Sequence, residues 1–248
     1  MALPRLCAIT ASAVTITAGC IVGAGTASAA TVHYVALGDS YSSGSGAGDY
    51  DPDSGSCRRS AKAFPKLWAA SRSPGSFKFV ACAGATTTKV EGQLGALSRR
   101  TTLVSLTVGG NDAGFSRVMV DCILGTTGKC ENAVKRSERY MRTTLPGRLD
   151  SLYDAIRKKA PSAHVVVLGY PRGYIRNSKG CVGLGQTKRR VLNRASDSLN
   201  TAIGKAVAEA GFTFSDVRDE FDGHELCSGD DWLNSVRWPI GDSYHPTA

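Results

Sequence analysis

Three stretches of the sequence carry residues whose types and spacing suit catalysis by a serine nucleophile. Ser40 stands in Gly38-Asp39-Ser40-Tyr41-Ser42, Gly84 follows an apolar run, and Asn111 lies in Gly110-Asn111-Asp112. A serine nucleophile needs hydrogen-bond donors for the oxyanion that forms on the carbonyl it attacks. The backbone N–H groups of Ser40 and Gly84 and the side-chain amide of Asn111 would supply three neutral donors. We therefore expect Ser40 to attack an acyl carbonyl inside a three-donor oxyanion hole.

The base that accepts the Ser40 proton has to come from four histidines, which are His33, His164, His224 and His245. The first two precede or begin apolar runs typical of strands, so they would lie at the wrong end of the sheet. The third shares a loop with a cysteine and is expected to be structural or exposed. His245 is therefore the predicted base, and Asp242, three residues earlier, could hold its ring in the correct tautomer.

Two other kinds of site are disfavoured by the sequence. The glycine-rich stretch Gly44-Ser45-Gly46-Ala47-Gly48 fits neither phosphate-binding pattern, G-x-G-x-x-G or G-x-x-x-x-G-K-[ST]. We expect it to be a mobile surface loop. No C-x-x-C occurs, and the segment from His224 to Ser228 lacks the second histidine of a zinc-protease helix, so no metal site is predicted.

The elements that must position these residues alternate between short apolar runs and helical patterns. Five runs suit strands, at residues 34–37, 77–81, 103–108, 165–168 and 212–217. The run at 165–168 is apolar throughout, as expected for a parallel strand buried on both faces. Ligands of such sheets bind beyond the carboxyl ends of the strands, where Ser40, Gly84 and Asn111 follow the first three runs.

Helical spacing appears twice between the last strands. Apolar residues recur every three or four positions from Met141 to Ile156, and again from Val191 to Val207, with Gly211 placed as a C-terminal cap. Alternating strands and helices predict an α/β fold with a parallel sheet covered on both faces. The sequence shows no internal repeat or linker, so residues 30–248 are expected to form one domain.

The first 29 residues are typical of a secretory signal peptide. Arg5 is followed by a mildly apolar stretch, and Ala27-Ser28-Ala29 forms a small-x-small cleavage site. Cleavage would leave an even number of cysteines, which in an exported chain indicates three disulfides. These are Cys57, Cys82, Cys122, Cys130, Cys181 and Cys227. Sequence alone cannot choose among the 15 pairings of six cysteines. We favour nearest neighbours in order, 57–82, 122–130 and 181–227.

The composition is that of a globular protein with a moderate positive charge. Apolar residues make up 42% of the 248 residues, charged residues 21%, and the formal net charge is +9. Basic clusters occur at Arg58-Arg59, Arg99-Arg100, Arg157-Lys158-Lys159 and Lys188-Arg189-Arg190. They lack interleaved aromatics, so nucleic acid is not an expected partner. We expect solvated helix faces, with steering towards anionic lipid headgroups as the alternative.

Taken in order, Gly38-Asp39-Ser40, Gly84, Gly110-Asn111-Asp112 and Asp242-x-x-His245 resemble the four blocks of the SGNH (GDSL) hydrolase superfamily. The longer segment from Gly38 to Gly44, with the cysteines, is most similar to the secreted bacterial lipase and esterase branch. The resemblance spans residues 33–247. It implies a flavodoxin-like three-layer α/β/α sandwich with a five-stranded parallel sheet. It also implies cofactor-free hydrolysis of carboxylic esters, with Ser40 as nucleophile, His245 as general base and then acid, and Gly84 and Asn111 in the oxyanion hole.

Two partners for the His245 ring remain open at this point. Some secreted relatives orient the histidine with a backbone carbonyl two residues before it, here that of Ser243. We favour the Asp242 carboxylate because the D-x-x-H pattern is intact. Family members usually continue into a final helix after His-Pro, whereas this chain stops at Ala248, so a C-terminal truncation is expected.

The resulting functional expectation is an extracellular serine esterase that acts on lipid esters, as a triacylglycerol lipase or a phospholipase A1. A carbohydrate acetylesterase is the alternative within the enzyme class. A secreted binding module with a decayed site is disfavoured because Ser40, Asn111 and His245 are all present. Expected partners are an ester substrate and, transiently, lipid interfaces, with the protein acting as a monomer.

Overall fold

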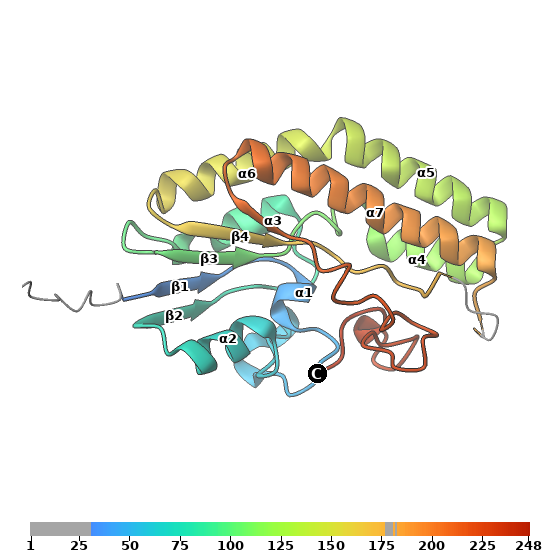
Figure 1. The fold of residues 1–248 in the computed structure, drawn as a ribbon, viewed down its shortest axis with the longest axis horizontal. Coiled ribbons are helices and arrows are strands. Elements are labelled where there is room, and N and C mark those ends of the chain that lie inside the picture. Colours follow the sequence, from blue (N-terminus) through green and yellow to red (C-terminus); the bar gives the residue numbers. More distant parts are fainter. Residues whose placement is uncertain (1–30, 177–180, 182) are drawn as a thin grey trace, which may run out of the picture. The chain divides into compact units, whose positions relative to one another are not determined.

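The computed structural model describes residues 31–176, 181 and 183–248 (Figure 1). The predicted signal peptide, residues 1–29, lies outside the described residues and stays a prediction.

Five strands form one parallel sheet in the order β2-β1-β3-β4-β5. Their bounds are β1 (His33–Ala36), β2 (Ser76–Phe79), β3 (Leu103–Leu106), β4 (His164–Leu168) and β5 (Thr213–Ser215). Each corresponds to one of the five predicted runs. In the register, Tyr34 of β1 pairs with Phe77 of β2 on one side and with Leu103 of β3 on the other. The carboxyl ends of these three neighbouring strands therefore meet at one edge of the sheet.

Seven α-helices and three short 3-10 helices connect the strands within the described residues. They are α1 (Ser40–Ser43), η1 (Pro52–Cys57), α2 (Phe64–Arg72), α3 (Thr87–Glu91), η2 (Gly92–Ala96), α4 (Phe115–Leu124), α5 (Thr127–Thr143), α6 (Leu145–Lys159), α7 (Gln186–Glu209) and η3 (Ile240–Asp242). Figure 1 shows α3, α6 and α7 on one face of the sheet and α2 on the other. This arrangement confirms the predicted three-layer α/β/α sandwich.

The apolar residues that gave the strand and helix patterns form the main core. Side chains from β1, β3 and β4 pack against the inner faces of α6 and α7, with Val104, Leu106, Leu149, Ile156 and Ile203 fully buried. A second buried cluster lies beyond the carboxyl ends of the strands, among α4, α5, α7 and the C-terminal segment. The second apolar cluster thus lies next to the carboxyl ends of the strands, where the polar candidate residues are found.

The helical pattern from Met141 to Ile156 belongs to two helices rather than one. α5 ends at Thr143 and α6 begins at Leu145, with Pro146 in its first turn. Proline lacks the backbone N–H that a continuous helix needs, and its ring would clash with the carbonyl four residues earlier, so it is tolerated only in the first turn of a new helix. The second pattern matches α7, and Gly211 follows its end with φ +66°, as expected for a C-terminal cap.

Three disulfides join the six cysteines in the pairs Cys57–Cys82, Cys122–Cys130 and Cys181–Cys227. These are the nearest-neighbour pairs that we favoured from the sequence. The first links η1 to the segment that follows β2, and the second links α4 to α5.

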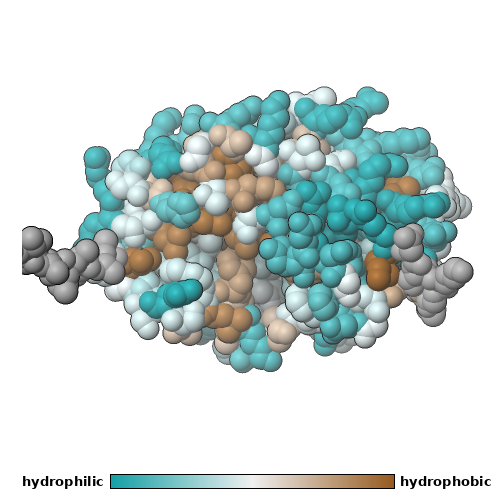
Figure 2. Space-filling model, viewed as in Figure 1, coloured by the Kyte–Doolittle hydropathy of each residue, from teal (hydrophilic) through white to brown (hydrophobic). Residues whose placement is uncertain are grey.

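The surface is unevenly apolar. On the face shown in Figure 2, brown residues gather in the left half, and teal residues dominate the right half. Among the described residues, no helix is both long and apolar enough to cross a membrane.

Candidate active site

Backbone hydrogen bonds bring the segments after the first three strands together. The N–H of Asp39 donates to the carbonyl of Thr107 (3.1 Å), and the N–H of Cys82 donates to the carbonyl of Gly38 (3.0 Å). Gly38 thus lies between the continuations of β2 and β3. Ser40, Gly84 and Asn111 each follow within two to four residues of these contacts.

Asp39 fixes the turn that carries Ser40. Its carboxylate caps α1 by accepting the N–H of Tyr41 (3.0 Å), and it also accepts the hydroxyls of Thr107 (2.6 Å) and Tyr170 (2.5 Å). Burial raises the pKa of Asp39 to about 6, against the hydrogen bonds, which lower it. Three hydrogen bonds hold the carboxylate in one position, so Ser40 is held at the first residue of the helix.

Gly38 is required by the same turn. Its φ is +120°, and a Cβ there would lie 2.6 Å from the hydroxyl of Ser42 and 2.7 Å from the Thr107 carbonyl. Side chains rarely adopt such a backbone conformation, and here the space for one is filled as well. This explains why glycine precedes Asp39-Ser40.

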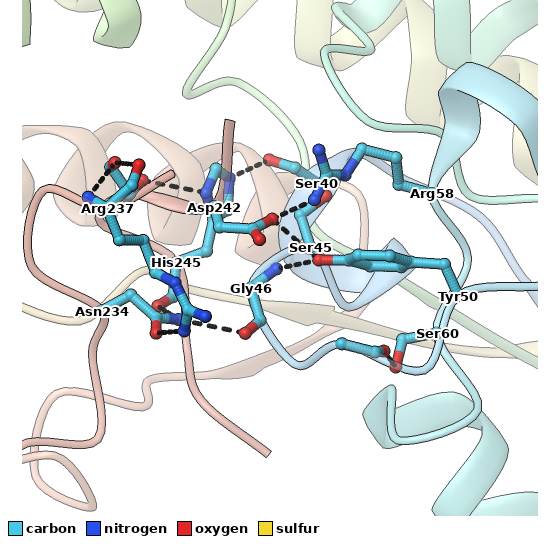
Figure 3. A network of polar contacts seen from close by, with 12 residues as sticks. Ser40, Ser45, Gly46, Tyr50, Arg58, Ser60, Asn234, Arg237, Asp242 and His245 are labelled. Carbon is cyan, nitrogen blue, oxygen red and sulfur yellow. Dashed lines mark hydrogen bonds and ion pairs between the residues drawn. The ribbon is translucent and has the colours of Figure 1, made fainter. Parts of the chain in front are cut away.

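Ser40 and His245 form a hydrogen-bonded pair (Figure 3). The distance from Ser40 Oγ to His245 Nε2 is 2.7 Å, and the distance from His245 Nδ1 to the carbonyl oxygen of Ser243 is 3.1 Å. A carbonyl can only accept, so Nδ1 carries the ring proton and Nε2 is left as an acceptor for the Ser40 hydroxyl. Burial lowers the pKa of His245 to about 4, so the ring is neutral near pH 7 and able to take a proton.

The preference for Asp242 as the partner of the ring was wrong. Its carboxylate accepts the hydroxyl of Tyr50 (2.8 Å) and forms an ion pair with Arg58, as Figure 3 shows. η3 ends at Asp242, and Tyr244 adopts φ +63°, so the chain turns between them and presents the Ser243 carbonyl to the ring. The described geometry is a Ser40–His245 pair oriented by a backbone carbonyl.

The three expected oxyanion donors are arranged to donate. Asn111 gives one amide N–H to the carbonyl of Ala85 (3.0 Å), which fixes the side chain and leaves the second N–H available. Among the described residues, the backbone N–H groups of Ser40 and Gly84 have no hydrogen-bond partner. Gly84 has φ +74° and is exposed, and a Cβ there would meet no atom within 4 Å. The backbone at Gly84 therefore borders open space.

A narrow apolar cavity opens beside Ser40 and Asn111. It encloses about 80 Å³, and its walls include side chains of α4, α5 and α7. Among the lining side chains are Val118, Met119, Met141, Leu192 and Leu199. Residues of both core clusters thus line a site in which the apolar part of a ligand can lie next to Ser40.

The other three histidines do not contact Ser40. His33 begins β1 and His164 begins β4, at the opposite end of the strands, as predicted. His224 stacks on Trp232 with ring centroids 3.7 Å apart, and its Nδ1 faces the carbonyl of Asp230 at 3.1 Å. Its position matches the structural role expected from the sequence.

The glycine-rich stretch at 44–48 is not a mobile surface loop. The N–H of Gly46 donates to the hydroxyl of Tyr50 (2.8 Å), and its carbonyl accepts from the amide of Asn234 (3.1 Å). A Cβ on Gly46 would lie 2.8 Å from the Cβ of His245. The loop packs against the His245 segment because glycine permits this close approach.

Sequence reasoning missed Tyr50, Arg58 and Asn234. Arg58 was expected on a solvated face, but its guanidinium pairs with Asp242 and lies 4.5 Å above the Tyr50 ring. The contacts of Tyr50 and Arg58 with Asp242 join residues more than 180 positions apart, which no local pattern reports. The alternate glycines at 44, 46 and 48, all with positive φ, are the one local signal that the segment is tightly turned.

Known proteins are similar to this chain in sequence and in fold. A family model described as the GDSL-like Lipase/Acylhydrolase family matches residues 36–248. Lipase 1 of Streptomyces coelicolor is 54% identical over 250 residues, covering 98% of this chain and 93% of that protein. The crystal structure of phospholipase A1 from Streptomyces albidoflavus NA297 has a TM-score of 0.86 and 55% identity, over 88% of this chain and 93% of that one. An extracellular lipase from Streptomyces rimosus gives the same TM-score at 50% identity, over the same shares of the two chains. The chain therefore belongs to the GDSL-like lipase/acylhydrolase family and is a carboxylic ester hydrolase.

Proposed function

We propose that this protein hydrolyses carboxylic esters of lipids, as a triacylglycerol lipase or a phospholipase A1, through an acyl-enzyme on Ser40. The observation that carries the proposal is the 2.7 Å contact between Ser40 Oγ and His245 Nε2 beside the apolar cavity. A nucleophile, a base and a place for an acyl chain occur together.

In the first half of the reaction, Ser40 Oγ attacks the ester carbonyl carbon as its proton passes to His245 Nε2. The electron pair of the carbonyl moves onto its oxygen, which accepts hydrogen bonds from the Ser40 and Gly84 N–H groups and the Asn111 amide. The carbonyl of Ser243 holds the imidazolium through Nδ1. Collapse of the intermediate breaks the bond to the alcohol, which leaves with the proton from Nε2.

In the second half, water attacks the acyl-enzyme with His245 again as base. The same donors hold the second oxyanion, and its collapse releases a fatty acid while the proton returns to Ser40 Oγ. No step uses the Asp242 carboxylate as a partner of the ring. In this account, Ser40 and His245 are the catalytic residues.

The lipid substrate class is supported by the cavity and by the relatives. The lining of the cavity is mostly apolar, so an acyl chain would bury apolar surface there at about 25 cal/mol per Å², whereas an acetyl group has little apolar surface to bury. The relatives are named lipases and a phospholipase A1. A carbohydrate acetylesterase is therefore the weaker alternative.

We further propose that residues 1–29 direct export and that residues 30–248 form the secreted catalytic domain, acting as a monomer. Three disulfides suit an oxidising compartment, and the Streptomyces rimosus relative is described as extracellular. Mass spectrometry of protein from the culture supernatant should find a mature N-terminus near residue 30.

A substrate panel tests the lipid assignment. Purified protein is given a long-chain triglyceride, a phospholipid with different acyl chains at its two positions, a short-chain ester and an acetylated sugar. Release of fatty acid from the long-chain substrates is expected, with the phospholipid losing the sn-1 chain. A marked preference for the acetylated sugar would replace the lipid proposal by the acetylesterase.

A further inference from the structure

Asp242 lies beside the proposed base without contacting its ring. The carboxylate is buried, accepts the Tyr50 hydroxyl at 2.8 Å and pairs with the half-buried guanidinium of Arg58. Tyr50 in turn accepts the Gly46 N–H, so one hydrogen-bonded chain runs from the glycine-rich loop to η3 (Figure 3). Asp242 is the last residue of η3, three residues before His245.

Arg58, the ion-pair partner of Asp242, lies on a segment that is linked to the proposed oxyanion hole. Arg58 follows Cys57, which is disulfide-bonded to Cys82, and the Cys57 carbonyl accepts the N–H of Ala83 at 3.0 Å. Gly84 comes next in the sequence. The Arg58–Asp242 contact therefore connects the segment that carries the base to the segment that carries an oxyanion donor.

The pair also places two opposite charges near the His245 ring. The Asp242 carboxylate raises the pKa of His245 and the Arg58 guanidinium lowers it, while burial has the largest effect. The other polar groups around His245 include the Ser40 hydroxyl and the Tyr41 side chain, whose ring centroid lies 5.2 Å away. The Arg237 guanidinium donates to Asn234 Oδ1 at 2.7 Å, and Asn234 in turn donates to the His245 carbonyl. Asp39, at the N-cap of α1, is the nearest further acid on that element.

We propose that Arg58 and Asp242 form a positioning pair, which fixes the His245 segment against Ser40 while the pair itself contributes no net charge beside the ring. The inference rests on the proposed roles of Ser40 and His245. A buried acid alone would oppose deprotonation of the imidazolium, and a buried guanidinium alone would oppose its formation. Paired, they tie two segments together with little effect on the basicity of the ring.

The test is a charge cycle made of Arg58→Gln, Asp242→Asn and the double variant, assayed on a soluble short-chain ester from pH 2.5 to 8. Asparagine keeps an oxygen that can accept the Tyr50 hydroxyl, so Asp242→Asn removes charge with little change of shape. Arg58→Lys keeps the charge and serves as the conservative variant. Thermal melting of each variant shows whether it is folded.

Opposite shifts of the acid limb of kcat/KM are expected from the two single variants. Arg58→Gln leaves the Asp242 carboxylate unpaired and should raise the pKa that defines the acid limb by on the order of one unit. Asp242→Asn should lower that pKa. The double variant should return to within a few tenths of the parent, and Arg58→Lys should stay near it. At pH 7, kcat of Asp242→Asn should fall roughly tenfold because the unpaired guanidinium disfavours the imidazolium. KM should hold, since neither residue lines the cavity.

Arg194→Gln with Glu138→Gln is the matched control, because that pair joins α7 to α5 at 2.9 Å and lies outside the site. The acid limb of kcat/KM in this control double variant should stay at the pH of the parent. Additive losses of kcat in the double variant with an unmoved limb would show a merely structural contact and overturn the inference. If Asp242→Asn does not fold, the contrast between Arg58→Gln and Arg58→Lys decides alone. Full turnover by Ser40→Ala or His245→Ala would instead defeat the proposed function.

Discussion

The Asn111 amide is the oxyanion donor whose contribution is simplest to measure, because its removal leaves the backbone donors in place. One of its N–H groups is fixed on the Ala85 carbonyl and the other is available. Asn111→Ala should lower kcat by about 10²–10³-fold, as for other single oxyanion donors, with a smaller effect on KM. Steady-state kinetics on a soluble ester measures this. An unchanged kcat would remove Asn111 from the hole.

The pH dependence of activity follows from the neutral state of His245. The ring must be unprotonated to accept the Ser40 proton, and burial lowers its pKa from 6.5 to about 4. Activity should therefore persist as the pH falls through 6.5 and be lost only near pH 4. A profile of kcat/KM reports the free enzyme's base. An acid limb near 6.5 that persists in Asp39→Asn would show a solvated His245 and contradict the described burial, whereas a limb lost in that variant would report Asp39, whose pKa burial raises to about 6.

Single residues with a local signature could be predicted from the sequence. Ser40, Asn111 and His245 lie at strand ends or in a short motif. The structure places Ser40 and Asn111 in the lining of one cavity and His245 within hydrogen-bond distance of Ser40. Asp242 could not be assigned, because residues two and three positions before a histidine can both approach its ring. The choice depends on the turn at Tyr244 and on Arg58, which is remote in sequence.

Helices α4, α5 and α7 supply the walls of the cavity, so their small residues should limit the acyl chain. Ala195 of α7 lines the cavity next to larger apolar residues. Ala195→Phe would fill this space and should move the preference from long-chain to short-chain esters, with about tenfold lower kcat/KM on the long chains. Rates on p-nitrophenyl esters of increasing length measure the change. Equal loss at every length would mean that the acyl chain lies elsewhere.

Elements were predictable where burial alone determines them. All five strands appeared as apolar runs because parallel strands are covered on both faces. Periodicity failed where backbone chemistry overrides it, since the apolar spacing continues from Met141 into α6 while Pro146 imposes a new start. The glycine-rich loop was misread for a related reason, because its contacts lie near the C-terminus.

The disulfides act on the stability of the whole molecule rather than on the chemistry. They close loops with sequence separations of 25, 8 and 46 residues, and each should contribute about 2–4 kcal/mol to the free energy of unfolding. Reduction should therefore lower Tm strongly and abolish activity through unfolding. Alkylation of the mature protein without reductant should modify no cysteine, whereas two or more modified cysteines would contradict three bridges.

The central claim is that Ser40 is an activated nucleophile, and covalent labelling tests it most directly. A fluorophosphonate reacts with a serine only when a base and an oxyanion hole activate it. Peptide mass mapping of the labelled protein should place one adduct on Ser40. Ser40→Ala and His245→Ala, checked by circular dichroism and melting, should take up no label and hydrolyse no ester. An adduct on a different serine, or ester turnover by folded Ser40→Ala close to that of the parent, would contradict the account.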